Sequence, residues 1–181
     1  MRISLILVAL MIILTGCFND DSETTQKKED NVNENEKTAS STWRKPPNNL
    51  NVRSGQKSFS SVRDDHCWGT DEDGDPCTIN PRDPDEVAGG SKMLRVSSGD
   101  KIILTLNNQM GSLPNPDKIE ATEFPPGDSE GRSVELMDDD FYQGTFHAPD
   151  GNGRYYYTVY MKWDSEDLIG EVYYDFSIHV N

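Results

Sequence analysis

Two cysteines in the middle of the chain, Cys67 and Cys77, are the residues whose type and spacing most directly suggest covalent chemistry. They lie ten positions apart, which is not the Cys-x-x-Cys spacing of thiol oxidoreductases. In an oxidising compartment a pair this close is expected to form one structural disulfide, which would stabilise the domain by roughly 2–3 kcal/mol. A redox-active pair and a metal site are the alternatives, and the spacing favours neither.

Carboxylates alternate along the segment between these cysteines, at Asp71, Asp73 and Asp75. Oxygen ligands of this kind can wrap a Ca²⁺ ion. An EF-hand loop needs Gly at its sixth position and Glu at its twelfth, whereas counting from Asp71 places Pro76 and Arg82 there. The segment is therefore predicted to be a solvated turn inside the disulfide loop, with Ca²⁺ binding as the alternative.

The three histidines, His66, His147 and His179, show no metal-ligand spacing, so a zinc site would have to be assembled from distant strands. A copper site of the cupredoxin kind needs two histidines and a thiolate, yet no cysteine follows Cys77. The histidines are predicted to be surface or turn residues. No metal and no other cofactor is expected.

Motifs of enzyme chemistry are absent from the sequence. It contains no Gly-x-Ser-x-Gly elbow, no Ser-x-x-Lys, no His-Glu-x-x-His and no phosphate-binding loop. Two carboxylates could act as acid and base on a glycoside, which leaves a hydrolase as one alternative. With 32 acidic residues, however, some pair lies close by chance. The domain is predicted to be non-catalytic.

Tyrosines give the best indication of a binding surface. Tyr156, Tyr160 and Tyr173 fall on the polar side of two alternating segments, opposite the predicted core. If the two segments pair as strands, the three rings share one sheet surface, and tyrosines displayed in this way are typical of contact surfaces. The alternative is that the Cys67–Cys77 segment covers this face and makes a second small core with Trp68.

The elements that must position these residues are strands with period-two patterning. Each of the three clearest strands has its apolar residues on one side, which is predicted to face the core. By strand, these residues are Val172, Tyr174, Phe176, Ile178 and Val180; Tyr155, Tyr157, Val159, Met161 and Trp163; and Ile102, Leu104 and Leu106. Weaker strand candidates are 57–62, 92–96, 118–124, 133–137 and 142–147.

Turn signals rich in Gly, Pro, Asn and Asp separate these segments, and no long amphipathic helix is present. Residues 83–89 predict one short helical turn, with Asp83 as N-cap, Pro84 at the first helical position and Gly89 at the end. Seven to eight short strands with this single turn predict an all-β, antiparallel sandwich.

The N-terminus predicts secretion. Residues 1–16 contain Arg2, an apolar run of about a dozen residues and small residues before Cys17, which is the pattern of a cleavable signal peptide. Leu14-Thr15-Gly16-Cys17 resembles the lipobox of bacterial lipoproteins. This resemblance implies cleavage before Cys17, attachment of a diacylglyceryl group to its thiol, modification with fatty acids such as palmitate, and anchoring to the outer face of the cell membrane.

Composition divides the remaining chain into two parts. Residues 17–49 have little to bury and are expected to form a disordered polar tether with a reach of about 30 Å, whereas 50–181 form the folded domain. The formal net charge of −15 repels nucleic-acid phosphates and anionic lipid headgroups. Nucleic acid is therefore not an expected partner, and membrane contact is expected through the lipid anchor.

Two further resemblances concern the fold. The run 148–155, followed by an aromatic strand, resembles a turn of immunoglobulin-like domains in which a Tyr packs across a Gly-containing turn. His66-Cys67-Trp68-Gly69, followed by Cys77, is similar to small extracytoplasmic domains of Gram-positive lipoproteins. Both imply an immunoglobulin-like sandwich with no settled activity.

Together these patterns predict a lipid-anchored envelope protein with a non-catalytic binding domain that contacts an envelope protein or polymer. Capture of a cation or small ligand by acidic loops is one alternative, and a carboxylate-based hydrolase is another.

Overall fold

Two long strands, β10 (Gly153–Asp164) and β11 (Ile169–Val180), form the centre of the fold. The computed structural model describes residues 45–69, 78–106, 113–139, 142–165 and 168–181, all within one compact unit, Thr38–Asn181. The two strands pair antiparallel along their whole length, with Tyr157 opposite Phe176 and Tyr160 opposite Tyr173. Because successive side chains of a strand point to opposite faces, this register separates an apolar face from a polar one.

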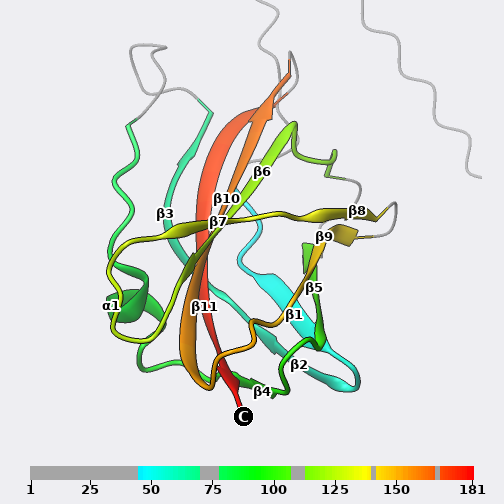
Figure 1. Ribbon diagram of the computed structural model, residues 1–181. Coiled ribbons are helices and arrows are strands. Elements are labelled where there is room, and N and C mark those ends of the chain that lie inside the picture. The colour runs from blue at the N-terminus through cyan, green and yellow to red at the C-terminus, as the bar shows by residue number, and fades with distance from the viewer. Residues whose placement is uncertain (1–44, 70–77, 107–112, 140–141, 166–167) are drawn as a thin grey trace, which may run out of the picture. The chain divides into compact units, whose positions relative to one another are not determined.

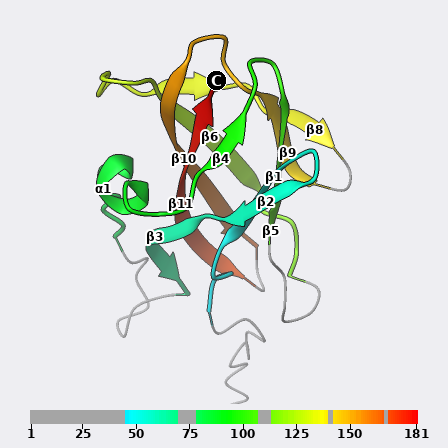
Figure 2. The same cartoon turned by 90° about the horizontal axis from the view of Figure 1, so that it is seen from below.

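The described strands form two facing sheets, which confirms an all-β sandwich (Figures 1 and 2). The larger sheet has the order β3 (Val62–Trp68), β11, β10, β6 (Lys118–Phe124) and β7 (Arg132–Val134), and β4 (Leu94–Val96) pairs in parallel with the end of β11. The smaller sheet has the order β2 (Lys57–Ser60), β1 (Leu50–Ser54), β5 (Lys101–Leu106), β9 (Tyr142–His147) and β8 (Met137–Asp139). Every other strand pairing is antiparallel.

The predicted count of seven to eight strands is too low, because the described residues contain eleven. Two predicted strands are each divided between the sheets. Residues 133–137 run from β7 in the larger sheet to β8 in the smaller one, and 57–62 run from β2 to the start of β3. The break before β3 lies at Ser61, whose hydroxyl accepts a hydrogen bond from the Leu50 amide at 2.8 Å. β1 was not predicted, since its five residues offer only a short alternation.

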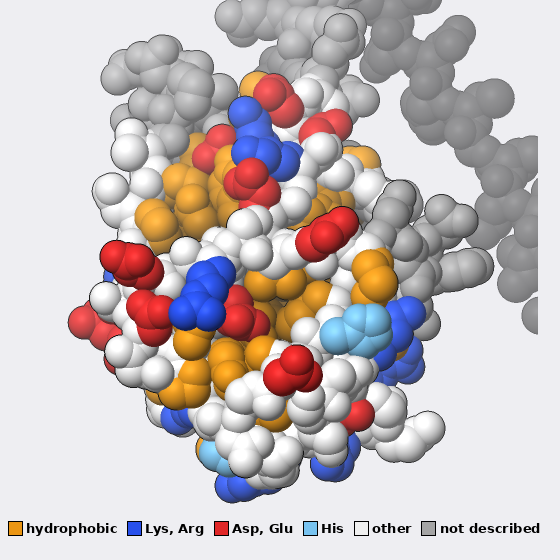
Figure 3. Space-filling view, viewed as in Figure 1, with side chains coloured by type: hydrophobic (Ala, Val, Ile, Leu, Met, Phe, Trp, Pro, Cys, Tyr) orange, Lys and Arg blue, Asp and Glu red, His pale blue; other side chains and the backbone are white. Residues whose placement is uncertain are grey.

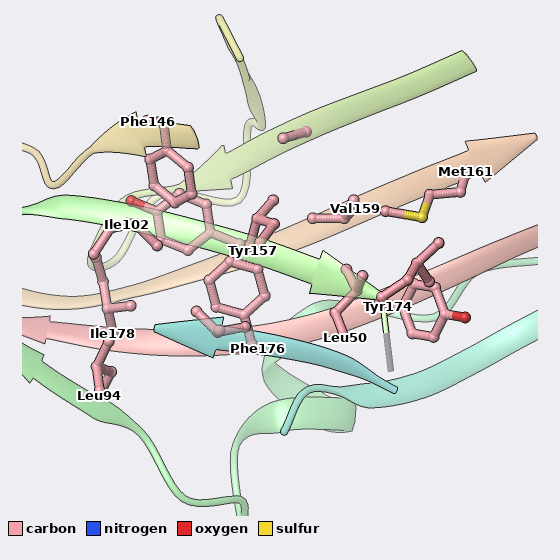
Figure 4. Close-up of a cluster of buried hydrophobic side chains, with 14 of the residues drawn as sticks. Leu50, Leu94, Ile102, Phe146, Tyr157, Val159, Met161, Tyr174, Phe176 and Ile178 are labelled. Carbon is pink, nitrogen blue, oxygen red and sulfur yellow. The ribbon is translucent and has the colours of Figure 1, made fainter. Parts of the chain in front are cut away.

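The core lies between the inner faces of the two sheets, as Figure 4 shows. All the residues predicted for the core sides of the three clearest strands are buried. Tyr157 is at its centre, stacked on Phe176 with ring centroids 5.0 Å apart and tilted against Phe146 at 5.1 Å. The Tyr157 hydroxyl donates a hydrogen bond of 2.7 Å to Glu123, so the one polar atom of this ring has a partner.

The predicted helical turn is present as α1 (Pro84–Ala88). Pro84 begins it, and the amides of Glu86 and Val87 donate to the Asp83 carbonyl, although the Asp83 side chain makes no capping hydrogen bond. Ala88 is fully buried, and α1 packs on β10, β11 and β3. The helix therefore covers part of the outer face of the larger sheet.

The N-terminal strap, which we define as residues 45–48, lies against the sandwich although the sequence places it at the end of the tether. Pro46 is buried, and its carbonyl accepts a hydrogen bond from Arg63 at 3.2 Å. The Pro47 carbonyl accepts one from the Tyr174 hydroxyl at 2.8 Å. The folded domain thus includes residues before Leu50.

Several expectations concern parts of the chain outside the described residues. These are the signal peptide 1–16, Cys17, most of the tether, and the acidic segment with Cys77. The immunoglobulin-like subclass stays a prediction, although the Tyr155 hydroxyl does lie across the turn against Gly151. Within the described ranges, no helix has both the length and the apolar character needed to cross a membrane.

Close packing of Trp68 on Gly170 predicts a selective effect of adding one methyl group. A Cβ at Gly170 would lie 2.6 Å from Cζ3 of Trp68, whereas a Cβ at Gly90 meets nothing within 4 Å. We expect Gly170→Ala to lower the free energy of unfolding by about 1–3 kcal/mol through overpacking. Urea denaturation monitored by circular dichroism measures this, with Gly90→Ala as the control that stays near wild type. Equal stability of the two variants would contradict the packing.

Candidate functional site

The outer face of the larger sheet holds the three tyrosines that the sequence predicts as a binding face. Tyr156, Tyr160 and Tyr173 are all partly exposed. Tyr160 and Tyr173 are direct cross-strand neighbours, with ring centroids 5.1 Å apart and planes tilted by 38°. A contact of this geometry is favourable beyond the area that it buries, so the two rings form one preorganised aromatic unit. We call it the tyrosine pair.

Charged residues of both signs surround the tyrosine pair. Lys118 lies over the Tyr160 ring, 5.7 Å from its centroid, and forms an ion pair of 2.9 Å with Glu120. Glu120 is also the residue opposite Tyr160 on β6. Partial burial, followed by the nearby Glu171 carboxylate, raises the pKa of Tyr160 to about 12. The phenol therefore stays protonated and remains a hydrogen-bond donor at physiological pH.

Tyr156 stands apart from the pair. It precedes Tyr160 by four residues on β10, a separation of roughly 13 Å at 3.3 Å per residue. Arg154 lies over its ring at 4.9 Å from the centroid and also donates to the Ser177 hydroxyl and the Ala88 carbonyl. The structure thus brings two of the three predicted tyrosines into contact and places the third beside the cation that holds α1.

A buried carboxylate lies on the same face between these two positions. Asp175 is 1 % exposed, and its Oδ1 accepts a hydrogen bond of 2.7 Å from Thr158. Its Oδ2 has no hydrogen-bond partner among the described residues. Burial is the main cause that raises the pKa of Asp175 to about 7, and the nearby Asp64 adds to it while Arg82 opposes it.

Asp64 shows how the segment before α1 covers this face. Its side chain is 1 % exposed and binds Arg82 through both the guanidinium and the backbone amide, at 2.6 and 2.7 Å. Sequence reasoning missed Asp175 because an outward carboxylate on a strand resembles any solvated residue. The signal that could have found it is the predicted turn 83–89, which needs a sheet surface on which to pack its apolar residues.

The other candidate residues are dispersed or lie outside the described part. Asp71, Asp73, Asp75 and Cys77 lie in the undescribed residues 70–77, and Cys17 lies in the undescribed residues 1–44, so the disulfide stays a prediction. Cys67 itself is 4 % exposed. The three histidines lie on three different strands. Among the described residues, no group of three or more His, Cys, Asp or Glu side chains could hold a metal ion.

The pockets in the described part of the sandwich include two of several hundred Å³. One, of about 460 Å³, is lined by Asn51, Ser58, Phe59, Ser60, Thr105 and Leu106, and the other, of about 370 Å³, by Lys45, Pro46, Arg63, His66 and Trp68. Neither set of lining residues contains an acid. The hydrolase alternative therefore has no pair of carboxylates in either hollow.

Comparison with known proteins adds no relative: the chain matches no protein-family model, no curated protein and no solved structure. Functional inference for this protein therefore depends on the chemistry of its own residues.

The raised pKa of Asp175 predicts an unusual pH dependence. Its value of about 7 in the folded state exceeds the unfolded value of 3.8, so the folded state binds the proton more tightly. This group's contribution to stability is complete below pH 4 and is lost as the pH rises to about 7. We expect Asp175→Asn to gain stability relative to wild type over that window, by up to about 4 kcal/mol.

Chemical denaturation at several pH values between 4 and 8 measures this difference. Glu130→Gln, at an exposed acid, serves as the matched control. An Asp175→Asn variant whose offset from wild type is the same at every pH would show that the carboxyl does not titrate in this window.

Proposed function

We propose that this protein is a binding module tethered to the outer face of the cell membrane, and that it contacts an envelope protein or polymer through the tyrosine pair. One observation carries the proposal: Tyr160 and Tyr173 lie in contact on the outer sheet face, and both remain partly exposed. Trp68, in contrast, packs inward on Trp163, at 5.1 Å between ring centroids, instead of covering these tyrosines.

The physical properties of the tyrosine pair suit a contact surface. Each ring offers a large apolar area with little conformational entropy to lose, because a tyrosine has few rotatable bonds. Rigid strands β10 and β11 hold both rings. Figure 3, which views the molecule as in Figure 1, shows apolar side chains exposed among acidic and basic ones. A charged rim around an apolar centre is the usual anatomy of a protein interface.

The proposed address comes from the N-terminal sequence. Signal 1–16 would direct export, Cys17 would carry the lipid, and the polar stretch after it would hold the domain away from the membrane. An oxidising exterior also suits the proposed Cys67–Cys77 disulfide. On this proposal the sandwich is an immunoglobulin-like domain displayed at the end of a tether.

The binding proposal is tested with the chain from Phe18 onward, which omits the signal and the lipid-bearing Cys17, labelled and titrated onto bacterial envelope fractions. We expect the Tyr160→Ala/Tyr173→Ala variant to bind at least 30-fold more weakly, since truncation of a central aromatic anchor costs about 2 kcal/mol or more. Met137→Ala removes an exposed apolar side chain from β8, in the other sheet, and should bind as wild type does.

Equal binding by the double variant, once its native circular dichroism is verified, would refute the role of the tyrosine pair. A loss that Met137→Ala shares would indicate non-specific adsorption instead.

Lipid attachment is tested independently. We expect Cys17→Ala to abolish incorporation of labelled palmitate, because the thiol that accepts the lipid is gone. The Cys67→Ala/Cys77→Ala variant retains Cys17 and should incorporate label normally. Label retained in Cys17→Ala would overturn the assignment.

A further inference from the structure

The pocket of about 370 Å³ has a composition opposite to that of the whole protein. Three of its five lining residues, Lys45, Arg63 and His66, carry basic side chains, and the other two are Pro46 and Trp68. None of the described residues that line it is acidic, although the chain has 32 acids against 17 lysines and arginines. The described lining of this pocket therefore has a charge balance opposite to that of the chain, whose net charge is −15.

The wall of this pocket is held in place before any ligand arrives. Arg63 donates from Nη1 to the Pro46 carbonyl at 3.2 Å and to Asn48 Oδ1 at 3.4 Å. The Tyr174 hydroxyl holds the Pro47 carbonyl at 2.8 Å. These bonds fasten the N-terminal strap beside β3, so the entropy of arranging this wall is already lost on folding.

Asp65, the acid beside His66 in the sequence, makes its hydrogen bonds with backbone amides. Asp65 accepts from the His66 backbone amide at 2.8 Å through Oδ1 and from the Asn80 amide at 2.6 Å through Oδ2. Its carboxylate thus has a backbone donor on each oxygen, and it is not among the lining residues. The described residues that line the pocket therefore supply basic side chains and no carboxylate.

The environment of His66 determines the charge of its imidazole in the free pocket. Burial lowers the pKa of His66, Arg63 lowers it further, and Asp65 partly opposes both. The free imidazole is therefore neutral at neutral pH and can donate or accept a hydrogen bond. An anion bound beside it would favour the charged form and raise its pKa.

Trp68 supplies a rigid apolar wall. Its ring meets Trp163 edge to face at 69°, and it packs so closely on Gly170 that no Cβ fits between them. The ring is nonetheless only partly buried and still lines the pocket. A flat apolar group of a ligand can therefore pack on Trp68 while Lys45 and Arg63 neutralise the charge of the same ligand.

We propose that the pocket lined by Lys45, Arg63, His66 and Trp68 binds a small organic oxyanion, a carboxylate or phosphate attached to a flat apolar group. Arg63 binds the charged oxygens, Lys45 and His66 add a charge and a hydrogen bond, and Trp68 contacts the apolar part. The site is separate from the tyrosine pair, because Tyr173 and Tyr174 are successive β11 residues on opposite faces and it is Tyr174 that holds the strap. Either site can fail without the other.

Isothermal titration calorimetry on the chain from Phe18 onward, which omits only the signal and the lipid-bearing Cys17, tests the proposal with four probes: phenyl phosphate, benzoate, inorganic phosphate and neutral benzyl alcohol. We expect phenyl phosphate or benzoate to bind, with whichever binds identifying the oxyanion, and benzyl alcohol not to. Arg63→Gln should weaken binding at least tenfold, as expected for loss of a charge-assisted hydrogen bond. Arg95→Gln, which removes the same charge on β4, should not.

Because Arg63 also holds the strap, Lys45→Gln gives a second test at an exposed residue, and it should weaken binding without altering the circular dichroism spectrum. NMR titration of the His66 imidazole should show its pKa rising when the probe is bound. Binding of neither aromatic anion, or equal binding by all variants, would overturn the proposal. Inorganic phosphate binding as tightly as phenyl phosphate would overturn the role of Trp68.

Discussion

The long antiparallel ladder between β10 and β11 is the constraint on which the rest of the molecule depends. Twelve residues of each strand pair without a break, from Gly153 opposite Val180 to Asp164 opposite Ile169. Because side chains alternate strictly along both strands, one register decides the face of every residue on them. The same ladder that stacks Tyr157 on Phe176 in the core brings Tyr160 against Tyr173 outside it. Core and candidate binding surface are two sides of one pairing.

The outer face of that ladder is divided into parts with different properties. Near the tyrosine pair it is partly exposed and bordered by charge, whereas around Asp175 and Ser177 it lies beneath α1 and the segment before it. The covered part includes a carboxyl whose charged form the structure stabilises poorly. Burial of a polar face in this way costs stability unless its polar groups are paired. The covering of this face by α1 and the segment before it therefore depends on specific contacts and not on space filling alone.

Sequence patterns could predict those parts of the fold that depend on a regular local pattern of residues. The core faces of β5, β10 and β11 follow from alternation, and α1 follows from its Asp-Pro start. Alternation cannot show where a strand leaves one sheet for the other, which is why 133–137 and 57–62 each contain two strands. Alternation also does not show which distant segments of the chain pack over a sheet face. The burial of Asp175 and the placement of Arg63, His66 and Trp68 beside the strap depend on segments distant in sequence.

The N-terminal strap has a mechanical consequence. Tension applied to the chain before Lys45 reaches the sandwich first at the Pro46 and Pro47 carbonyls, which Arg63 and Tyr174 hold from β3 and β11 of the larger sheet. Beyond the strap the chain enters β1, which is flanked on both sides by β2 and β5 in the smaller sheet. A pull on the chain before Lys45 would therefore meet hydrogen bonds to the larger sheet before it reaches β1 in the smaller one.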